Sequence, residues 1–151
     1  MMNCLTLTIL SSLCLQQANS IKMIGVTAEA GVLSTSQHTE LSCDYLKWKQ
    51  EELVSLNWAV QYPGVKTDFL QFSFDGGKRT PSNDILGVDL GSVDEKTVSV
   101  LVSDTFNEDR LTICCEVIFL RDSGYGSMAK KVKEKCSSFS VSRGKNLKWI
   151  L

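Results

Sequence analysis

Short runs of alternating or β-branched residues, separated by clusters of Gly, Asp, Asn and Ser, make up the chain from Ile21 onward. Side chains on a half-buried strand alternate between core and solvent, so this pattern predicts strands and no long amphipathic helix. We expect about eight strands, over residues 22–28, 38–45, 54–61, 68–74, 84–90, 96–103, 110–120 and 129–141. Turn residues separate them at 62–64, 75–77, 91–92 and 123–126. This regular spacing predicts an all-β antiparallel sandwich or barrel.

The same alternation selects the side chains that face the core. Every second residue is apolar in four of the expected strands: Leu41, Cys43 and Tyr45; Leu56, Trp58 and Val60; Val98, Val100 and Val102; and Leu111, Ile113, Cys115, Val117 and Phe119. The pattern therefore predicts that Cys43, Trp58 and Cys115 point into one core.

Residues 1–20 differ from the rest of the chain. They carry no charged side chain, hold an apolar run from Leu5 to Leu15, and close on the small polar sequence Ala-Asn-Ser. This is typical of a secretory signal peptide, although no Lys or Arg precedes the apolar run. A membrane anchor is the alternative, but a spanning helix needs roughly 20 apolar residues and Gln16 ends this run. We expect a secreted chain with no transmembrane segment, whose mature form begins near Ile21.

Length and composition limit the fold and the partners. The 151 residues are 43% hydrophobic and 22% charged, and include two prolines. There is room for one folded domain, and a disordered or collagen-like chain is excluded. The net charge of -1 argues against nucleic acid as the main partner, because phosphate binding needs a clearly basic surface.

Removal of the signal would leave four cysteines, namely Cys43, Cys114, Cys115 and Cys136. An even number of cysteines in an oxidising compartment is normally paired, and four of them allow three connectivities.

The spacing around two of these cysteines resembles the immunoglobulin superfamily. Leu41-x-Cys43 resembles the second strand of such a domain, and Trp58 follows 15 residues later, where the third strand's tryptophan belongs. The run Asp109-x-Leu111-x-Ile113-x-Cys115 resembles the approach to the sixth strand's cysteine. The 57 residues from Trp58 to Cys115 leave room for the extra middle strands of the variable type.

The resemblance covers residues 25–141 and implies an antiparallel, two-sheet, V-type sandwich with a disulfide between Cys43 and Cys115. The residues that would form its core are Leu41, Trp58, Val100, Val102 and Ile113. Ile113 stands where the tyrosine of the tyrosine corner is usual, so we expect the hydrogen bond of that corner to be missing.

A second disulfide follows from the last hairpin. If this hairpin is centred on Tyr125, Cys114 and Cys136 lie opposite one another, each 11 residues from the centre. The alternative is that Cys136 stays free or pairs between chains. The same register sets Glu116 against Glu134, an unfavourable pair that a bulge in the last strand would relieve. It also turns three lysines toward the inner face: Lys131, Lys133 and Lys135.

Catalytic and metal sites are not expected. The one histidine, His38, starts a strand, so no Cys/His or Ser/His/Asp set can be assembled. The vicinal cysteines with Cys136 lack the spacing of zinc ligands. We therefore expect no enzyme activity, no metal and no cofactor.

A binding surface is expected on the strand 110–120, whose end Val-Ile-Phe-Leu is apolar on both faces. Only one face is needed for the core, and V-type domains commonly pair through the other, so an apolar strip there is a candidate interface. The alternative is that loop 62–67 covers it. One of Phe69 and Phe72 is expected to be in the core. The candidate residues are Asn57, Gln61, Tyr62, Phe69, Ile118, Leu120, Arg121 and Tyr125.

Charge is divided unevenly along the chain. Residues 128–151 hold seven basic side chains and one acidic one, a net of +6, while residues 21–127 hold nine and 16, a net of -7. The basic set is a candidate site for an anionic partner such as a sulfated glycan or an acidic protein surface; a solvated face and self-association are the alternatives. Its members are Lys130, Lys131, Lys133, Lys135, Arg143, Lys145 and Lys148.

At finer grain the chain resembles the first domain of the beaten-path group of arthropod neuronal surface proteins. The residues concerned are Cys43-x-Tyr45, Val54-Ser55-x-x-Trp58, Phe69-x-x-Phe72 and Cys115-Glu116-Val117. Residues 21–142 would form the domain and 143–151 a short basic tail. We expect a secreted or cell-surface-associated binding module for recognition or adhesion, whose partner is another protein, such as an immunoglobulin-like receptor or a second copy. The alternative is a secreted defence or glycan-binding factor that uses the basic C-terminal segment.

Overall fold

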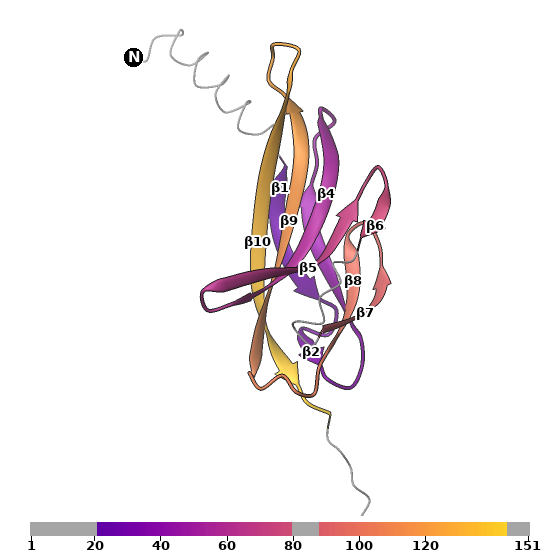
Figure 1. The fold of residues 1–151 in the computed structure, drawn as a ribbon, viewed down its shortest axis with the longest axis vertical. Helices are drawn as coiled ribbons and strands as arrows, with labels where there is room; N and C mark the ends of the chain where they lie inside the picture. Colours follow the sequence, from indigo (N-terminus) through magenta and orange to yellow (C-terminus); the bar gives the residue numbers. More distant parts are fainter. Residues whose placement is uncertain (1–20, 80–87, 145–151) are drawn as a thin grey trace, which may run out of the picture.

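The computed structural model describes residues 21–79 and 88–144. Strands make up most of this part (Figure 1). They are β1 Lys22–Ala28, β2 Val32–Ser34, β3 Thr39–Leu46, β4 Glu51–Tyr62, β5 Val65–Ser73, β6 Gly77–Arg79, β7 Val88–Val93, β8 Thr97–Val102, β9 Arg110–Asp122 and β10 Met128–Ser142.

The strands form two sheets packed face to face. One has four strands in the order β1-β3-β8-β7, and the other has six in the order β2-β10-β9-β4-β5-β6. All neighbouring strands are antiparallel except β2 and β10, which pair in parallel at residues 32–34 and 140–142. The predicted all-β, two-sheet sandwich is confirmed.

The core lies between the sheets and includes all of the side chains that alternation assigned to it. Leu41, Trp58, Val100, Val102 and Ile113 are each at most 1% exposed. Burying side chains of this size typically contributes about 1.5–3 kcal/mol each. The two short strands β2 and β6 were not predicted, because three residues are too few to show a periodicity.

One predicted turn is wrong. Gly91 and Ser92 lie inside β7, where the pairing with β8 shifts between Leu90 and Val93. A Cβ on Gly91 would lie 3.0 Å from Cδ2 of His38 and 3.1 Å from Cβ of Ser99. Glycine is needed here for close approach of neighbouring side chains and not to reverse the chain. Part of the expected strand 84–90 lies outside the described residues.

Two hairpins organise the six-stranded sheet. Pro63 and Gly64 connect β4 to β5, and Gly64 has a φ of 84°, as the third residue of a type II turn requires. The turn between β9 and β10 holds Gly124 and Gly126, with φ of 83° and 75°. The register expected for this second hairpin is observed, with Cys114 opposite Cys136. β10 has no bulge where it pairs with β9, because the pairing runs unbroken from Met128 to Ser140.

Candidate functional site: the outer face of the six-stranded sheet

The outer face of the six-stranded sheet is formed by every second residue of its central strands, pointing away from the core. We define the outer face by Asn57, Ala59 and Gln61 of β4, Cys114, Glu116, Ile118 and Leu120 of β9, and Lys130, Val132, Glu134 and Cys136 of β10. Four of the predicted binding residues, Asn57, Gln61, Ile118 and Leu120, are thus brought together on one surface.

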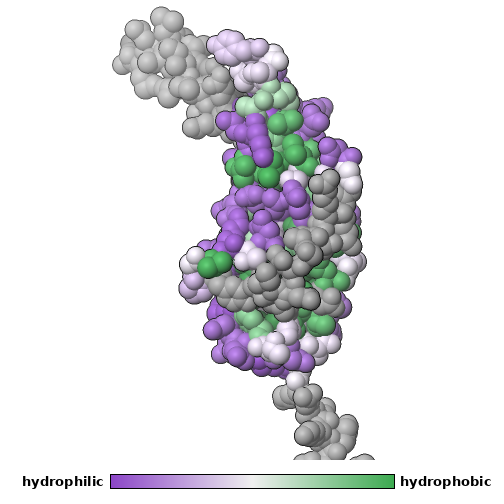
Figure 2. Space-filling view, in the orientation of Figure 1, coloured by the Kyte–Doolittle hydropathy of each residue, from purple (hydrophilic) through white to green (hydrophobic). Residues whose placement is uncertain are grey.

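An apolar strip occupies one end of this face. Ile118 and Leu120 are half-buried, and Val132, the register partner of Ile118, is 52% exposed. Figure 2 shows hydrophobic residues gathered over the upper part of the sheet, with hydrophilic residues below them. We use "apolar strip" for Ile118, Leu120 and Val132.

The hairpin between β4 and β5 is directed away from this strip. Its last pair, Tyr62 with Val65, extends beyond Gln61, which pairs with Thr112 on β9. Leu120 lies eight positions further along β9, toward its other end. The register therefore disfavours the alternative in which loop 62–67 covers the strip.

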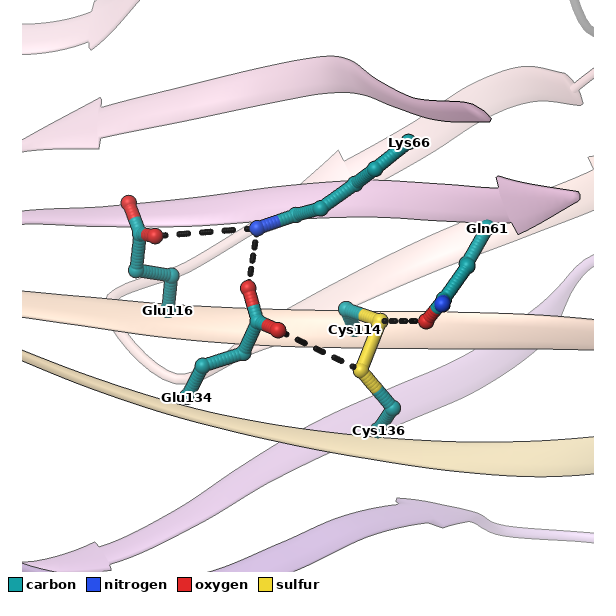
Figure 3. The surroundings of a disulfide bond; sticks show 6 residues. All are labelled: Gln61, Lys66, Cys114, Glu116, Glu134 and Cys136. Atoms are coloured by element: carbon teal, nitrogen blue, oxygen red, sulfur yellow. Dashed lines mark hydrogen bonds and ion pairs between the residues drawn. A yellow bond between two sulfur atoms is a disulfide. The ribbon is translucent and has the colours of Figure 1, made fainter. Parts of the chain in front are cut away.

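A charged cluster lies next to the strip (Figure 3). Glu116 and Glu134 are opposite one another, as predicted, and Lys66 from β5 reaches between them. Its Nζ lies 3.6 Å from Oε2 of Glu116 and forms an ion pair with Glu134. Asn57 donates a hydrogen bond of 3.0 Å from Nδ2 to Oε1 of Glu116. The like-charge pair is thus compensated by a third strand, and no bulge is needed.

Lys66 was missed by the sequence-based prediction, although a signal existed. The two-residue turn at Pro63 and Gly64 sets Lys66 opposite Gln61, on the same face as Glu116. Burial lowers the pKa of Lys66, but the hydrogen bond to Glu134 and the charges of Glu134, Glu116 and Asp68 outweigh this and raise it above its usual value.

Replacing Lys66 with methionine is expected to destabilise the domain by about 1 kcal/mol, a small value because the lysine side chain is 34% exposed to screening solvent. A raised folded pKa means that this contribution is present at neutral pH and is lost as pH rises through the folded pKa. Urea unfolding near neutral pH measures the change. Lys130→Met is the control, since Lys130 has no ion-pair partner in the described part of the chain. An equal loss in both variants would show that the cluster contributes nothing specific.

The Cys114–Cys136 disulfide lies next to the charged cluster of Lys66, Glu116 and Glu134. The two Cα atoms lie 4.0 Å apart, as in a narrow antiparallel pair, with the side chain of Cys114 buried and that of Cys136 exposed. Oε1 of Gln61 lies 3.4 Å from Sγ of Cys114, and Oε1 of Glu134 lies 3.6 Å from Sγ of Cys136. The sulfur atoms of Cys114 and Cys136 and a carboxylate oxygen of Glu134 are atom types that can bind a metal ion, and they lie within 4.8 Å of one another. Sulfur atoms joined in a disulfide carry no thiolate charge and do not act as metal ligands. In the disulfide form this group is therefore a cross-link between β9 and β10 and not a metal centre.

The core disulfide joins Cys43 of β3 to Cys115 of β9, with Cα atoms 6.1 Å apart. Both cysteines and Trp58 are 0% exposed. Cys114 and Cys115 therefore form disulfides on opposite faces of β9. The Cys115 bond links the two sheets, and the Cys114 bond links neighbouring strands within one sheet.

Other predicted binding residues lie elsewhere. Tyr125 is 95% exposed at the hairpin tip, and Arg121 is on the inner side of β9, paired with Glu51. The prediction that Phe69 belongs to the binding surface is wrong, because its side chain is 5% exposed and lies in the core. The β4–β5 register shifts between Trp58 and Ala59, which turns both Phe69 and Leu70 inward. The side chain of Tyr62 lies outside what the structure describes.

The basic residues are not brought to one surface. Lys130 is on the outer face, whereas Lys131, Lys133 and Lys135 point to the other side of β10, paired with Phe119, Val117 and Cys115 and exposed. Arg143 follows the far end of β10 and donates to the carbonyl of Glu108 at 3.3 Å. Lys145 and Lys148 lie outside the described residues.

The three inner-side lysines are placed where they can protect an edge. β2 covers β10 only at residues 140–142, so within residues 21–79 and 88–144 no strand pairs with the outer edge of β10 from 128 to 139. Replacing Lys131, Lys133 and Lys135 together with threonine is expected to promote self-association, because charged side chains on an open edge oppose edge-to-edge pairing. Light scattering across a concentration series measures this. Replacing Arg143, Lys145 and Lys148 with threonine removes the same charge and is the control; equal association would attribute the effect to net charge alone.

The part of the chain that the structure describes contains no helix that could span a membrane.

The order of the strands, the disulfide between the sheets and the buried tryptophan define an immunoglobulin-like sandwich of the V type. A solved structure of murine CRIg is similar to this chain, with a TM-score of 0.55 and 13% sequence identity over 81% of this chain and 98% of that chain. At this identity the similarity shows the fold alone. No family model matches the chain, and no curated protein matches it either. The finer resemblance to the beaten-path group is not shown by these comparisons.

Proposed function

We propose that this chain is a non-catalytic binding module that recognises another protein outside the cell through the outer face of its six-stranded sheet. The observation that carries the proposal is the apolar strip of Ile118, Leu120 and Val132, which the core does not need. Apolar surface surrounded by polar groups is a common property of protein interfaces.

The surroundings of the strip support this function. Lys66, Glu116 and Glu134 are held in one arrangement by ion pairs, and the Cys114–Cys136 disulfide fixes the strands beneath them. A surface that is already ordered loses little conformational entropy on binding. Charged groups beside an apolar centre also favour partners of complementary charge.

An extracellular location accords with the two disulfides, since such bonds persist in oxidising compartments. The partner we propose is a cell-surface protein with an apolar surface of its own, such as an immunoglobulin-like receptor, or a second copy of this chain. A role in neuronal guidance is the narrower form of the proposal and rests on the beaten-path resemblance.

Replacing Ile118 with aspartate is expected to leave folding intact and to weaken partner binding at least about tenfold, because a charge would be desolvated inside the apolar contact. The matched control is Ile24→Asp, since Ile24 is 57% exposed on β1 of the other sheet. Binding of multimerised protein to an array of cell-surface ectodomains measures the effect, and circular dichroism verifies folding. Unchanged binding by folded Ile118→Asp would exclude this face.

The alternative function, glycan binding through the basic C-terminal segment, has a separate test. Retention of the protein on immobilised heparin that disappears on deletion of residues 142–151 would favour this alternative.

A further inference from the structure

A buried carboxylate lies beside the first described residue of the chain. Glu51, the first residue of β4, is only 2% exposed, and Arg121 is its register partner on β9. Carboxylates are almost never buried this deeply unless paired, because the charged form loses its hydration. Glu51 therefore needs strong compensation from the groups around it.

Both oxygens of Glu51 accept hydrogen bonds from the backbone. The backbone nitrogen of Ile21 lies 3.0 Å from Oε1 in a buried contact, and that of Trp48 lies 3.3 Å from Oε2. The loop that leads into β4 is closed by a hydrogen bond of 3.1 Å from the N–H of Glu51 to the carbonyl of Trp48. The carboxylate is thus held in a fixed position, with one oxygen directed at the nitrogen of Ile21.

Ile21 is itself anchored. Its side chain is 0% exposed and belongs to the core, and the residue lies immediately before the first residue of β1. The peptide bond before Ile21 is also where the sequence predicts that a signal peptide ends. Cleavage one residue later would remove a core side chain, and cleavage one residue earlier would place an extra residue between the new terminus and Glu51.

We propose that cleavage of the peptide bond between Ser20 and Ile21 creates an α-ammonium group that forms a buried ion pair with Glu51. A secretory-pathway endopeptidase would hydrolyse this bond. Water adds across it, Ser20 takes the carboxylate, and Ile21 takes the amine, which binds a proton at neutral pH. The neutral N–H donor at 3.0 Å from Oε1 becomes a cationic one, so the hydrogen bond to the carboxylate becomes an ion pair as well.

The consequence is a link between processing and stability. The ion pair ties the start of β1 in one sheet to the start of β4 in the other. Removal of the signal would then complete the fold, because the positive charge on the Ile21 nitrogen exists only after the bond is cut. This inference does not depend on what the outer face binds.

The test combines two changes in a double-mutant cycle. Chains that begin at Ile21 and chains that retain Ser20 are prepared with Glu51 and with Glu51→Gln, after the N-terminus of the secreted protein has been determined by mass spectrometry. We expect the secreted chain to begin at Ile21. We expect retention of Ser20 to raise the unfolded-to-folded ratio at least about tenfold when Glu51 is present, and much less in Glu51→Gln.

A mature N-terminus at another residue would overturn the proposal, and so would an equal effect of Ser20 in both backgrounds. A second measurement applies if Glu51→Gln does not fold. The α-amine of Ile21 in the native protein should resist acetylation by an amine-specific reagent and should react freely in urea. Equal reactivity in both conditions would show that the terminus is not buried and paired.

Discussion

Replacing Cys43 and Cys115 together with alanine is expected to lower the free energy of unfolding by about 4 kcal/mol. The bond spans 72 positions of sequence, and the chain-entropy model assigns a loop of that length a contribution of this size. Small domains have a total free energy of unfolding of about 5–15 kcal/mol, so this loss would remove a large part of the stability of the domain.

Urea unfolding of the purified double variant measures this change, with secretion yield as a second measure. Replacing both cysteines avoids a free thiol that could exchange with the other bond. A matched control is Trp58→Phe, which keeps the bond and removes only part of the neighbouring side chain. A loss under about 1 kcal/mol in the double variant would mean that packing around Trp58, and not the bond, holds the two sheets together.

Replacing Cys114 and Cys136 together with serine is expected to cost about 2–3 kcal/mol, less than loss of the core bond. The loop is shorter, at 22 positions, so this bond removes less conformational entropy from the unfolded chain. Cys136 is exposed while Cys43 and Cys115 are 0% exposed, so a mild reductant should open the Cys114–Cys136 bond first.

Mass spectrometry after brief reduction and alkylation of the folded protein tests this order. We expect modification at Cys114 and Cys136, with Cys43 and Cys115 still joined. Simultaneous opening of both bonds would contradict the order and would indicate that reduction proceeds through global unfolding.

The sequence predicted the parts of the fold that depend on strict alternation. Trp58, Ile113 and the valines of β8 are buried as expected, because one residue of slip would have exposed all of them. The second disulfide could be predicted for a similar reason: a hairpin with a known centre fixes every pair along it. Phe69 was misplaced because an irregularity between Trp58 and Ala59 breaks the alternation, and a sequence does not show where such a shift occurs.

The candidate site was only partly predictable. Ile118 and Leu120 were found because they are apolar where the core has no use for them. Lys66 was missed because its role depends on Glu116 and Glu134, which are 50 and 68 positions away in sequence. The contact between Ile21 and Glu51 was missed for the same reason, since it joins the starts of strands in different sheets.

The central claim, that the outer face binds a partner protein, is tested most directly by covering the apolar strip with a glycan. Ile118→Asn with Leu120→Thr creates an Asn-Phe-Thr acceptor on the strip, and Glu40→Asn creates an Asn-Leu-Ser acceptor at an exposed position of β3, in the other sheet. Binding of both glycosylated proteins to the ectodomain that captures the unmodified chain is measured. We predict loss of binding for the first and unchanged binding for the second. Full binding by a folded protein that carries the glycan on the strip would contradict the account.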